Sequence, residues 1–215
     1  MSVRAIIADD HPLFRSALLQ AIQSVLGGKI LQAANFQDTC ELLNENPEVE
    51  LVFLDLNMPG NQGLTGLSFL RNAYPGVLVI MVSAVEDTST ICRAMDFGAS
   101  GYIPKSASLE HIAQAVRQVL EGEIWLPHSM ENDLPSQERS KDREFSAKLD
   151  KLTPHQFRVL TLLADGLLNK QIAYELKVQE TTIKQHVSAI LRKLELINRT
   201  QAGVVFKQVM GESTE

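Results

Sequence analysis

Acidic, hydroxyl and amine side chains stand at the ends of four short apolar runs in the first part of this 215-residue sequence. In chain order these residues are Asp9, Asp10, Asp55, Ser83 and Lys105. Crowded carboxylates repel one another unless a cation joins them, and their oxygens are ligands that suit Mg²⁺. A lysine and a hydroxyl can both pair with phosphoryl oxygens. The set therefore predicts a magnesium-dependent site in which Asp55 is a nucleophile that forms an aspartyl-phosphate.

The apolar runs have the length and composition of buried strands. They span residues 3–8, 51–54, 77–82 and 100–103, and residues 29–33 form a fifth, weaker candidate. Near-continuous apolar runs of this length are typical of strands that are covered on both faces of a parallel sheet. In such a sheet the site lies outside the carboxyl ends of the strands. We therefore expect the polar residues that end the runs to meet at one edge.

The segments between the runs have a helical period of apolar residues. In one of them the expected buried face consists of Leu13, Ala17, Leu18 and Ile22. Five strand–helix units predict an α/β domain, doubly wound, with a five-stranded parallel sheet and helices on both faces.

An enzyme is the first alternative for this site. Hydrolases of the haloacid-dehalogenase kind also use an aspartate that follows a strand, but they need a second aspartate two residues later. Asn57 occupies that position after Asp55. We therefore expect no enzyme function.

Four motifs resemble the receiver domain of bacterial two-component response regulators, over about residues 2–121. They are DDHPLFR at 9–15, LDLNMPG at 54–60, Ser83-Ala84, and ASGYIPKS at 99–106. The resemblance implies that a sensor histidine kinase phosphorylates Asp55. It also implies that Mg²⁺ is held by Asp9, Asp10, Asp55 and the Asn57 carbonyl. In the implied switch, Ser83 moves toward the phosphoryl group and Tyr102 changes its packing.

The last part of the chain is predicted to be helical. Thr153 and Gln156 have the spacing of a capping box at a helix start. Asn169 is expected to cap the next helix, and a third helix is expected over about residues 180–194. A fourth begins near 198–200. Two short helices joined by a tight turn are the helix-turn-helix pattern, although a solvated polar face is an alternative explanation of the third helix.

The segment 149–210 resembles the LuxR/FixJ-type (NarL-like) DNA-binding domain, on LTPHQFRVLTLLADGLLNKQIAYEL followed by TTIKQHVSAILRKLELINRTQA. The resemblance implies that base edges of double-stranded DNA are contacted by Lys184, Gln185 and Ser188. It implies phosphate contacts from Lys170, Gln171, Thr182, His186, Arg192, Lys193 and Arg199. It also implies a homodimer in the active state, with Val205 and Val209 as candidate contacts in the last helix, and leaves RNA polymerase open as a further partner.

Charge divides the chain unevenly. Residues 1–121 carry 7 Lys/Arg against 13 Asp/Glu, whereas residues 150–210 carry 9 against 5. A mildly basic end suggests binding to a polyanion, although random surface charge on two domains explains the counts equally well. The polar stretch 131–148 has too few apolar residues to offset the cost of ordering, so we expect a flexible or partly helical linker.

The remaining composition excludes several classes of protein. The chain is 45% hydrophobic with a mean hydropathy of −0.03, which argues against wholesale disorder. No run approaches the ~18 apolar residues of a membrane-spanning helix. Two cysteines are too few for a disulfide framework or a four-ligand zinc site. These observations predict a cytoplasmic protein without a role for the membrane.

The expected organisation is a receiver domain over 1–121, a linker over 122–148, a DNA-binding domain over 149–210 and an acidic tail over 211–215. Our hypothesis is that phosphorylation biases the receiver surface around residues 87–97 and Tyr102, which then releases or pairs the DNA-binding domains. A DNA binder or adaptor that works without phosphorylation is the alternative.

Overall fold

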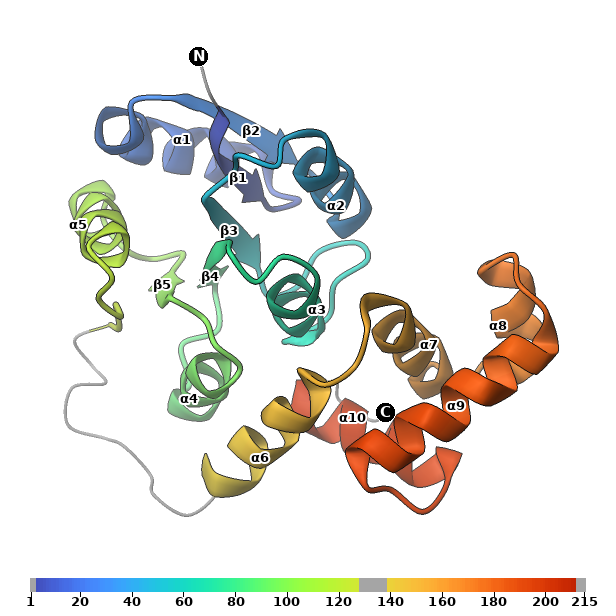
Figure 1. Ribbon diagram of the computed structural model, residues 1–215. Helices are drawn as coiled ribbons and strands as arrows, with labels where there is room; N and C mark the ends of the chain where they lie inside the picture. Colours follow the sequence, from blue (N-terminus) through green and yellow to red (C-terminus); the bar gives the residue numbers. More distant parts are fainter. Residues whose placement is uncertain (1–2, 128–138, 212–215) are drawn as a thin grey trace.

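Five parallel strands form the centre of the first part of the chain in the computed structural model, which describes residues 3–127 and 139–211 (Figure 1). The sheet order is β2-β1-β3-β4-β5. The strands are β1 (Val3–Ala8), β2 (Lys29–Ala33), β3 (Leu51–Asp55), β4 (Leu78–Ser83) and β5 (Gly101–Pro104). Each predicted run agrees with a strand to within a residue or two, and the predicted α/β fold is confirmed.

Register brings the ends of the strands together. Leu54 in the central strand β3 lies between Ala8 of β1 and Met81 of β4. On the far side of β4, Ser83 pairs with Pro104 of β5. Parallel strands present their carboxyl ends at the same edge, so the residues that follow them share one site.

Helices cover both faces of the sheet. They are α1 (Pro12–Leu26), α2 (Phe36–Glu45), α3 (Thr65–Ala73), α4 (Thr88–Asp96) and α5 (Leu109–Leu120). Helices α1 and α5 pack on one face through residues such as Ile22 and Val116, and α2, α3 and α4 cover the other. The predicted inner face of α1 is wrong at Leu13, whose exposed fraction is 87%. Leu13 lies in the first turn of the helix, whereas the buried residues of α1 begin at Leu18.

The predicted C-terminal helices are α7 (Pro154–Ala164), α8 (Asn169–Glu175), α9 (Glu180–Leu194) and α10 (Arg199–Met210). The Thr153–Gln156 capping box at the start of α7 is confirmed. The expected cap at Asn169 is wrong, because Leu168 is the residue that precedes α8. The Leu168 N–H donates to Gln171 Oε1 at 2.7 Å, so a glutamine inside the helix does part of the work of a cap.

The expected linker, 122–148, lies partly outside the described residues, since 128–138 are not among them. Residue Trp125 continues the sheet, and its carbonyl accepts a hydrogen bond from the Tyr102 N–H. The later part forms α6 (Arg139–Leu149), which buries Phe145 and Leu149. Helix α6 contacts α3 and α4 on one side and α9 on the other.

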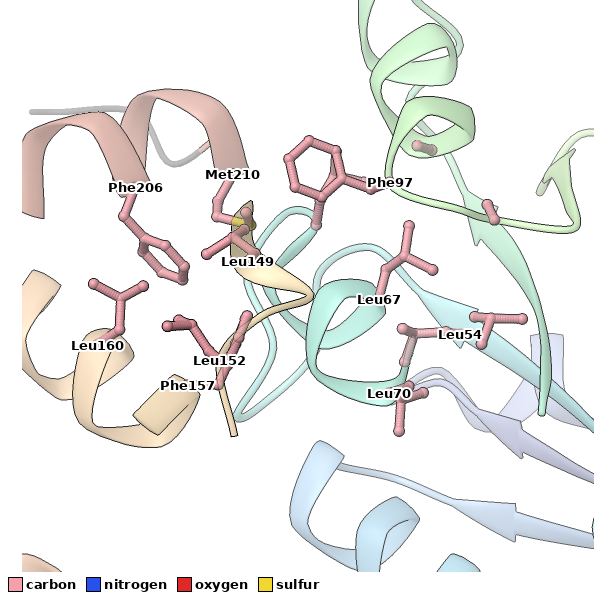
Figure 2. Close-up of a cluster of buried hydrophobic side chains, with 14 of the residues drawn as sticks. Leu54, Leu67, Leu70, Phe97, Leu149, Leu152, Phe157, Leu160, Phe206 and Met210 are labelled. Atoms are coloured by element: carbon pink, nitrogen blue, oxygen red, sulfur yellow. The ribbon is translucent and has the colours of Figure 1, made fainter. Parts of the chain in front are cut away.

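One hydrophobic cluster continues from the α2–α4 face of the sheet into the C-terminal helices. Figure 2 shows Leu67 and Phe97 of the α/β domain in the same cluster as Met210 at the end of α10. A row of edge-to-face aromatic pairs also crosses the boundary, running through Phe36, Phe69, Phe157 and Phe206. The two parts of the chain therefore share a core rather than a loose surface contact.

Candidate phosphorylation site and DNA-binding surface

Three carboxylates meet at the carboxyl ends of β1 and β3, as predicted, and we call Asp9, Asp10, Asp55 and Lys105 the acidic pocket. The side-chain ligand atoms of the three aspartates and His11 lie within 4.8 Å of one another. Asp9 is 1% exposed and Asp55 is 4% exposed, whereas Asp10 lies at the surface. Two buried carboxylates and one exposed carboxylate thus face a common point.

Lys105 joins the two buried carboxylates. Its Nζ is 2.7 Å from Asp9 Oδ2 and 2.8 Å from Asp55 Oδ2. The Lys105 stem also places the ammonium 5.2 Å from the centre of the Phe14 ring. This single ammonium leaves the three carboxylates with a net negative charge, which attracts a further cation.

Burial sets the proton affinity of these groups. The pKa of Asp55 is raised because desolvation disfavours its charged form, and the hydrogen bond from Lys105 offsets this only in part. Burial also disfavours the Lys105 ammonium, but its hydrogen bonds to Asp55 and Asp9 outweigh that effect and raise its pKa. The two groups therefore stabilise one another as an ion pair.

The donor set fits Mg²⁺. Carboxylate oxygens and open positions for water are what this ion prefers, and the acidic pocket opens on one side to solvent. A cleft of about 910 Å³ between the two parts of the chain borders the acidic pocket at Asp10. Its lining includes Asp10 and Asn57 on one wall and Thr161, Asp165 and Lys207 on the other.

The predicted switch residues lie on the next two strands of the sheet, Ser83 at the end of β4 and Tyr102 in β5. Ser83 is buried, and its Oγ accepts a hydrogen bond from the Val85 N–H at 3.0 Å. Tyr102 is fully buried, and its hydroxyl donates to the Val85 carbonyl at 2.6 Å. Desolvation raises the pKa of Tyr102 to about 12. Both side chains thus bond to the same residue of the β4–α4 loop.

His11 is a pocket residue to which the sequence analysis gave no role. Its Nδ1 lies 2.7 Å from Asp10 Oδ1 and 3.1 Å from Asp9 Oδ1. The signal was present in the sequence, since His11 directly follows the two aspartates. A residue at the start of a helix is usually interpreted as a helix cap, so a place for His11 in the acidic pocket is easily overlooked.

The DNA-binding candidates divide into an exposed and an inward-facing group. The exposed ones are Lys170, Gln171, Lys184, Gln185, Ser188 and Arg192. The last four of these, together with Ala189, line a shallow groove along α9. The half-buried ones are Thr182, His186, Lys193 and Arg199.

Two of the half-buried candidates already have partners within the helical domain. Lys193 Nζ donates to the Lys151 carbonyl and to Gln156 Oε1, both at 2.7 Å. Arg199 donates to the Leu167 carbonyl at 2.7 Å and to Asn169 at 3.2 Å. Both cations therefore tie helices together in this structure.

His186 has a different neighbour. Its ring centre lies 4.8 Å from that of His155 on α7. Desolvation, together with the His155 ring, lowers the pKa of His186, which favours its neutral form at the DNA-binding surface.

Comparisons with known proteins identify the class. Residues 5–117 match the family model of the response regulator receiver domain, and residues 150–206 match that of the bacterial regulatory proteins of the luxR family. The chain therefore belongs to the response regulators that join a receiver domain to a LuxR-type DNA-binding domain. It is a DNA-binding transcriptional regulator of the NarL-like kind, as the motifs predicted.

Individual relatives agree with this assignment. The chain is 40% identical over 204 residues to the glycerol metabolism activator of Pseudomonas putida, covering 93% of this chain and 92% of that protein. It is 32% identical over 200 residues to the nitrate/nitrite response regulator protein NarL of Escherichia coli strain K12, with 93% and 92% covered.

Solved structures share the fold. A complex of the response regulator RcsB with DNA aligns with a TM-score of 0.57 and 20% identity over the whole of both chains. A LuxR family DNA-binding response regulator from Silicibacter pomeroyi aligns with a TM-score of 0.52 and 32% identity, covering 60% of this chain and 99% of that one. Among the described residues, no helix combines the length and the apolar character needed to cross a membrane.

Proposed function

We propose that a sensor histidine kinase switches this regulator by phosphorylating Asp55. The observation that carries the proposal is the acidic pocket itself. Asp55 is buried at the end of the central strand, paired with Lys105 at 2.8 Å and crowded by two further carboxylates. An aspartate with only a structural role needs a single hydrogen-bond or ion-pair partner. Three carboxylates and a lysine around one point instead suit a phosphoryl group and a metal ion.

The residues of the pocket would divide the work of phosphoryl transfer. A carboxylate oxygen of Asp55 attacks the phosphorus of a phosphohistidine; the new O–P bond forms as the P–N bond breaks, and the electron pair returns to the imidazole. Lys105 is placed to pair with one phosphoryl oxygen. The Ser83 hydroxyl can donate to another once it releases the Val85 N–H.

Asp9, Asp10, Asp55 and the Asn57 carbonyl are the residues that would hold Mg²⁺, which when bound neutralises charge on the phosphoryl group. The chain then acts as the acceptor of a group that the kinase supplies. We accordingly assign it no enzyme activity on other substrates.

The β3–α3 loop, residues 56–64, gives phosphorylation a direct route to the DNA-binding domain. It directly follows Asp55, and its last residue, Leu64, donates its N–H to the Met210 carbonyl at 3.0 Å. Helix α4 makes a second contact, because Arg93 donates to the Gln208 carbonyl at 3.4 Å. A phosphoryl group adds about −1.5 to −2 charges beside this loop, and we propose that the change weakens both contacts.

The exposed face of α9 would then read double-stranded DNA. Lys184, Gln185 and Ser188 lie on this exposed face and would approach base edges in the major groove, Lys184 after it leaves its ion pair with Glu180 at 2.8 Å. Arg192 would approach a phosphate. A homodimer would place two such helices on two half-sites. Such a protein meets its kinase and its DNA in the cytoplasm.

The test compares the parent protein with Asp55→Asn. Each is incubated with Mg²⁺ and a small phosphodonor such as phosphoramidate, and intact-protein mass spectrometry follows the gain of one phosphoryl group. We expect the parent to gain it and Asp55→Asn to remain unmodified. Fragment masses that place the group on another residue would contradict the assignment.

DNA binding by the same two samples separates the switch from its alternative. Duplexes selected from a random pool serve as the probe, and affinity is measured with and without the phosphodonor. The proposal requires the donor to change the affinity of the parent but not of Asp55→Asn. Equal affinity in all four measurements would instead support a binder that works without phosphorylation.

A further inference from the structure

The DNA-reading face of α9 stays accessible in the closed form, as we call the arrangement in which the receiver and the helical domain share a core. The groove along this face is lined by side chains of α9 alone: Lys184, Gln185, Ser188, Ala189 and Arg192. The opposite face of the helix buries Ile183, Ile190 and Leu194 in the helical domain. In the part of the chain that the structure describes, the groove therefore takes no wall from the receiver.

The receiver contacts the helical domain at other elements. Its helix α3 contacts α6 and α7, and its helix α4 contacts α6. Helix α7 contacts both α3 and α9, and so lies between them (Figure 1). The acidic receiver, with 13 Asp/Glu against 7 Lys/Arg over residues 1–121, is thus separated from the groove by a helix. A helix is about 10 Å across, which is about one Debye length at 0.1 M salt, so the receiver repels DNA phosphates at the groove only weakly.

The candidate contacts for pairing are placed differently. Val205 and Val209 of α10 are half-buried, and they pack against the hydrophobic cluster that the two domains share. Val209 lies between Gln208 and Met210, whose carbonyls both accept hydrogen bonds from the receiver. The receiver therefore holds the end of α10 that a second chain would have to approach.

We propose that the closed chain already binds a single DNA half-site as a monomer, and that opening controls only the pairing of two chains on two half-sites. The inference rests on the proposed function in one respect, because it takes α9 as the element that reads DNA. It adds a DNA-binding activity of the closed, unphosphorylated chain. Linked contacts bind far more tightly than single ones, so a change in pairing alone is sufficient to change the affinity for two adjacent half-sites.

The test uses the full-length, unphosphorylated chain and two duplexes, which carry one or two copies of a half-site. The half-site is the sequence shared by the duplexes that the parent selects from a random pool. Fluorescence anisotropy gives the affinity of the parent, Gly63→Ala, Gly60→Ala and Arg192→Ala for each duplex. A Cβ atom at Gly63 would collide with the Met210 carbonyl and open the domains, whereas one at Gly60 meets Phe36 inside the receiver.

We expect the parent and Gly63→Ala to bind the single half-site with affinities within about twofold of each other, because a ligand that binds both forms equally is insensitive to opening. On two half-sites, Gly63→Ala should bind at least about tenfold more tightly than the parent and Gly60→Ala. Arg192→Ala should bind both duplexes more weakly. Unchanged binding by Arg192→Ala would refute α9 as the DNA reader, which is the part of the proposed function that the inference needs. No phosphodonor is present, so these results do not depend on whether Asp55 is phosphorylated.

Hydrogen exchange on the parent provides a second measurement that needs no variant. Residues 200–211 should keep their protection when the single half-site is saturated, because binding does not require opening. Faster exchange there in the complex would show that the receiver covers α9 and overturn the inference. A single-half-site affinity of Gly63→Ala that rises with its extra opening would overturn it equally. Equal affinity of the parent and Gly63→Ala for two half-sites would refute the restraint on pairing.

Discussion

The contact between Gly63 and Met210 offers the most direct way to test how the two domains communicate. Gly63 has a φ of +56°, and a Cβ atom added there would lie 2.0 Å from the Met210 carbonyl oxygen. Ordinary contacts of a Cβ begin near 3.4 Å, so in Gly63→Ala the end of α10 must withdraw by about 1.4 Å. The α/β domain cannot relieve the clash by moving a side chain, because both partners are main chain.

The cost falls on the closed arrangement of the two domains. Withdrawal breaks the Leu64–Met210 hydrogen bond, worth about 1 kcal/mol. It also exposes part of the Met210 side chain, now fully buried, whose burial contributes about 2 kcal/mol. The left-handed backbone strains an alanine equally in the closed and open forms, so that term cancels. The closed form should therefore lose about 3 kcal/mol, which is roughly a hundredfold in the opening equilibrium.

Hydrogen exchange followed by mass spectrometry measures that equilibrium without a known DNA site. Peptides that cover residues 60–70 and 200–211 should exchange roughly a hundredfold faster in Gly63→Ala, provided that their exchange reports domain opening. Gly60→Ala is the matched control. Gly60 also has a positive φ, of +81°, but a Cβ there meets Phe36 of α2 at 3.3 Å, within the receiver domain.

Two results would refute the reasoning. One is unchanged protection of residues 200–211 in Gly63→Ala. The other is equal acceleration in Gly60→Ala, which would show that backbone strain alone loosens the loop. A second variant approaches the interface from another point: Asn72 donates to the Leu152 carbonyl at 2.6 Å, so Asn72→Ala should also speed exchange at the end of α10.

Three further predictions concern the core, the switch strand and the DNA-binding surface. Phe206→Ala should lower the free energy of unfolding by about 3–5 kcal/mol, as measured by urea denaturation, because the ring is fully buried; a loss below 1 kcal/mol would contradict the tight packing of this ring. Tyr102 has a pKa near 12 in the folded protein against 10.0 for an ordinary tyrosine, so the stability that this raised pKa gives is complete below pH 10 and is lost as the pH rises to 12. In Tyr102→Phe, stability should fall less steeply over that interval, and parallel curves would show that Tyr102 does not titrate there. Arg192→Ala should weaken DNA binding for all sequences and reduce the salt slope by about 1. Lys193→Ala should lower stability and leave the salt slope unchanged, because its ammonium is bonded inside the domain; a reduced slope would restore Lys193 as a phosphate contact.

Much of the receiver fold could be predicted because four of the five strands are apolar runs that stop at or just before a polar residue with a chemical role. Asp55 and Ser83 are both the last residues of their strands, so the same positions marked the element and the site. The prediction was wrong at Leu13, because helical period says which residues share a face but not where the helix leaves the sheet. Asn169 was wrong for a similar local reason, since it is the first residue of α8 and the capping position falls on Leu168.

The pocket was predictable in its residues but not in its distances. Sequence order placed Asp9, Asp55 and Lys105 at strand ends, whereas the pairing of one ammonium with two buried carboxylates depends on the register of β1, β3 and the β5–α5 loop. The sequence could not predict either that Lys193 and Arg199 donate hydrogen bonds to groups inside their own domain. A basic residue on a helix has the same sequence signature whether it faces DNA or a carbonyl of its own domain.

The chemistry of the domain interface explains why a modest signal could open it. Its apolar part is the burial of Met210 and its neighbours, while three of its hydrogen bonds run from donors on the receiver, Leu64, Asn72 and Arg93, to carbonyl oxygens of the second half of the chain. On opening, water can satisfy those carbonyls, so each hydrogen bond contributes only about 1 kcal/mol net. The burial of Met210 contributes about 2 kcal/mol more. The free-energy change that a new charge beside the β3–α3 loop causes is of the same order as these contributions. That is the condition for a two-state switch rather than a permanent closure.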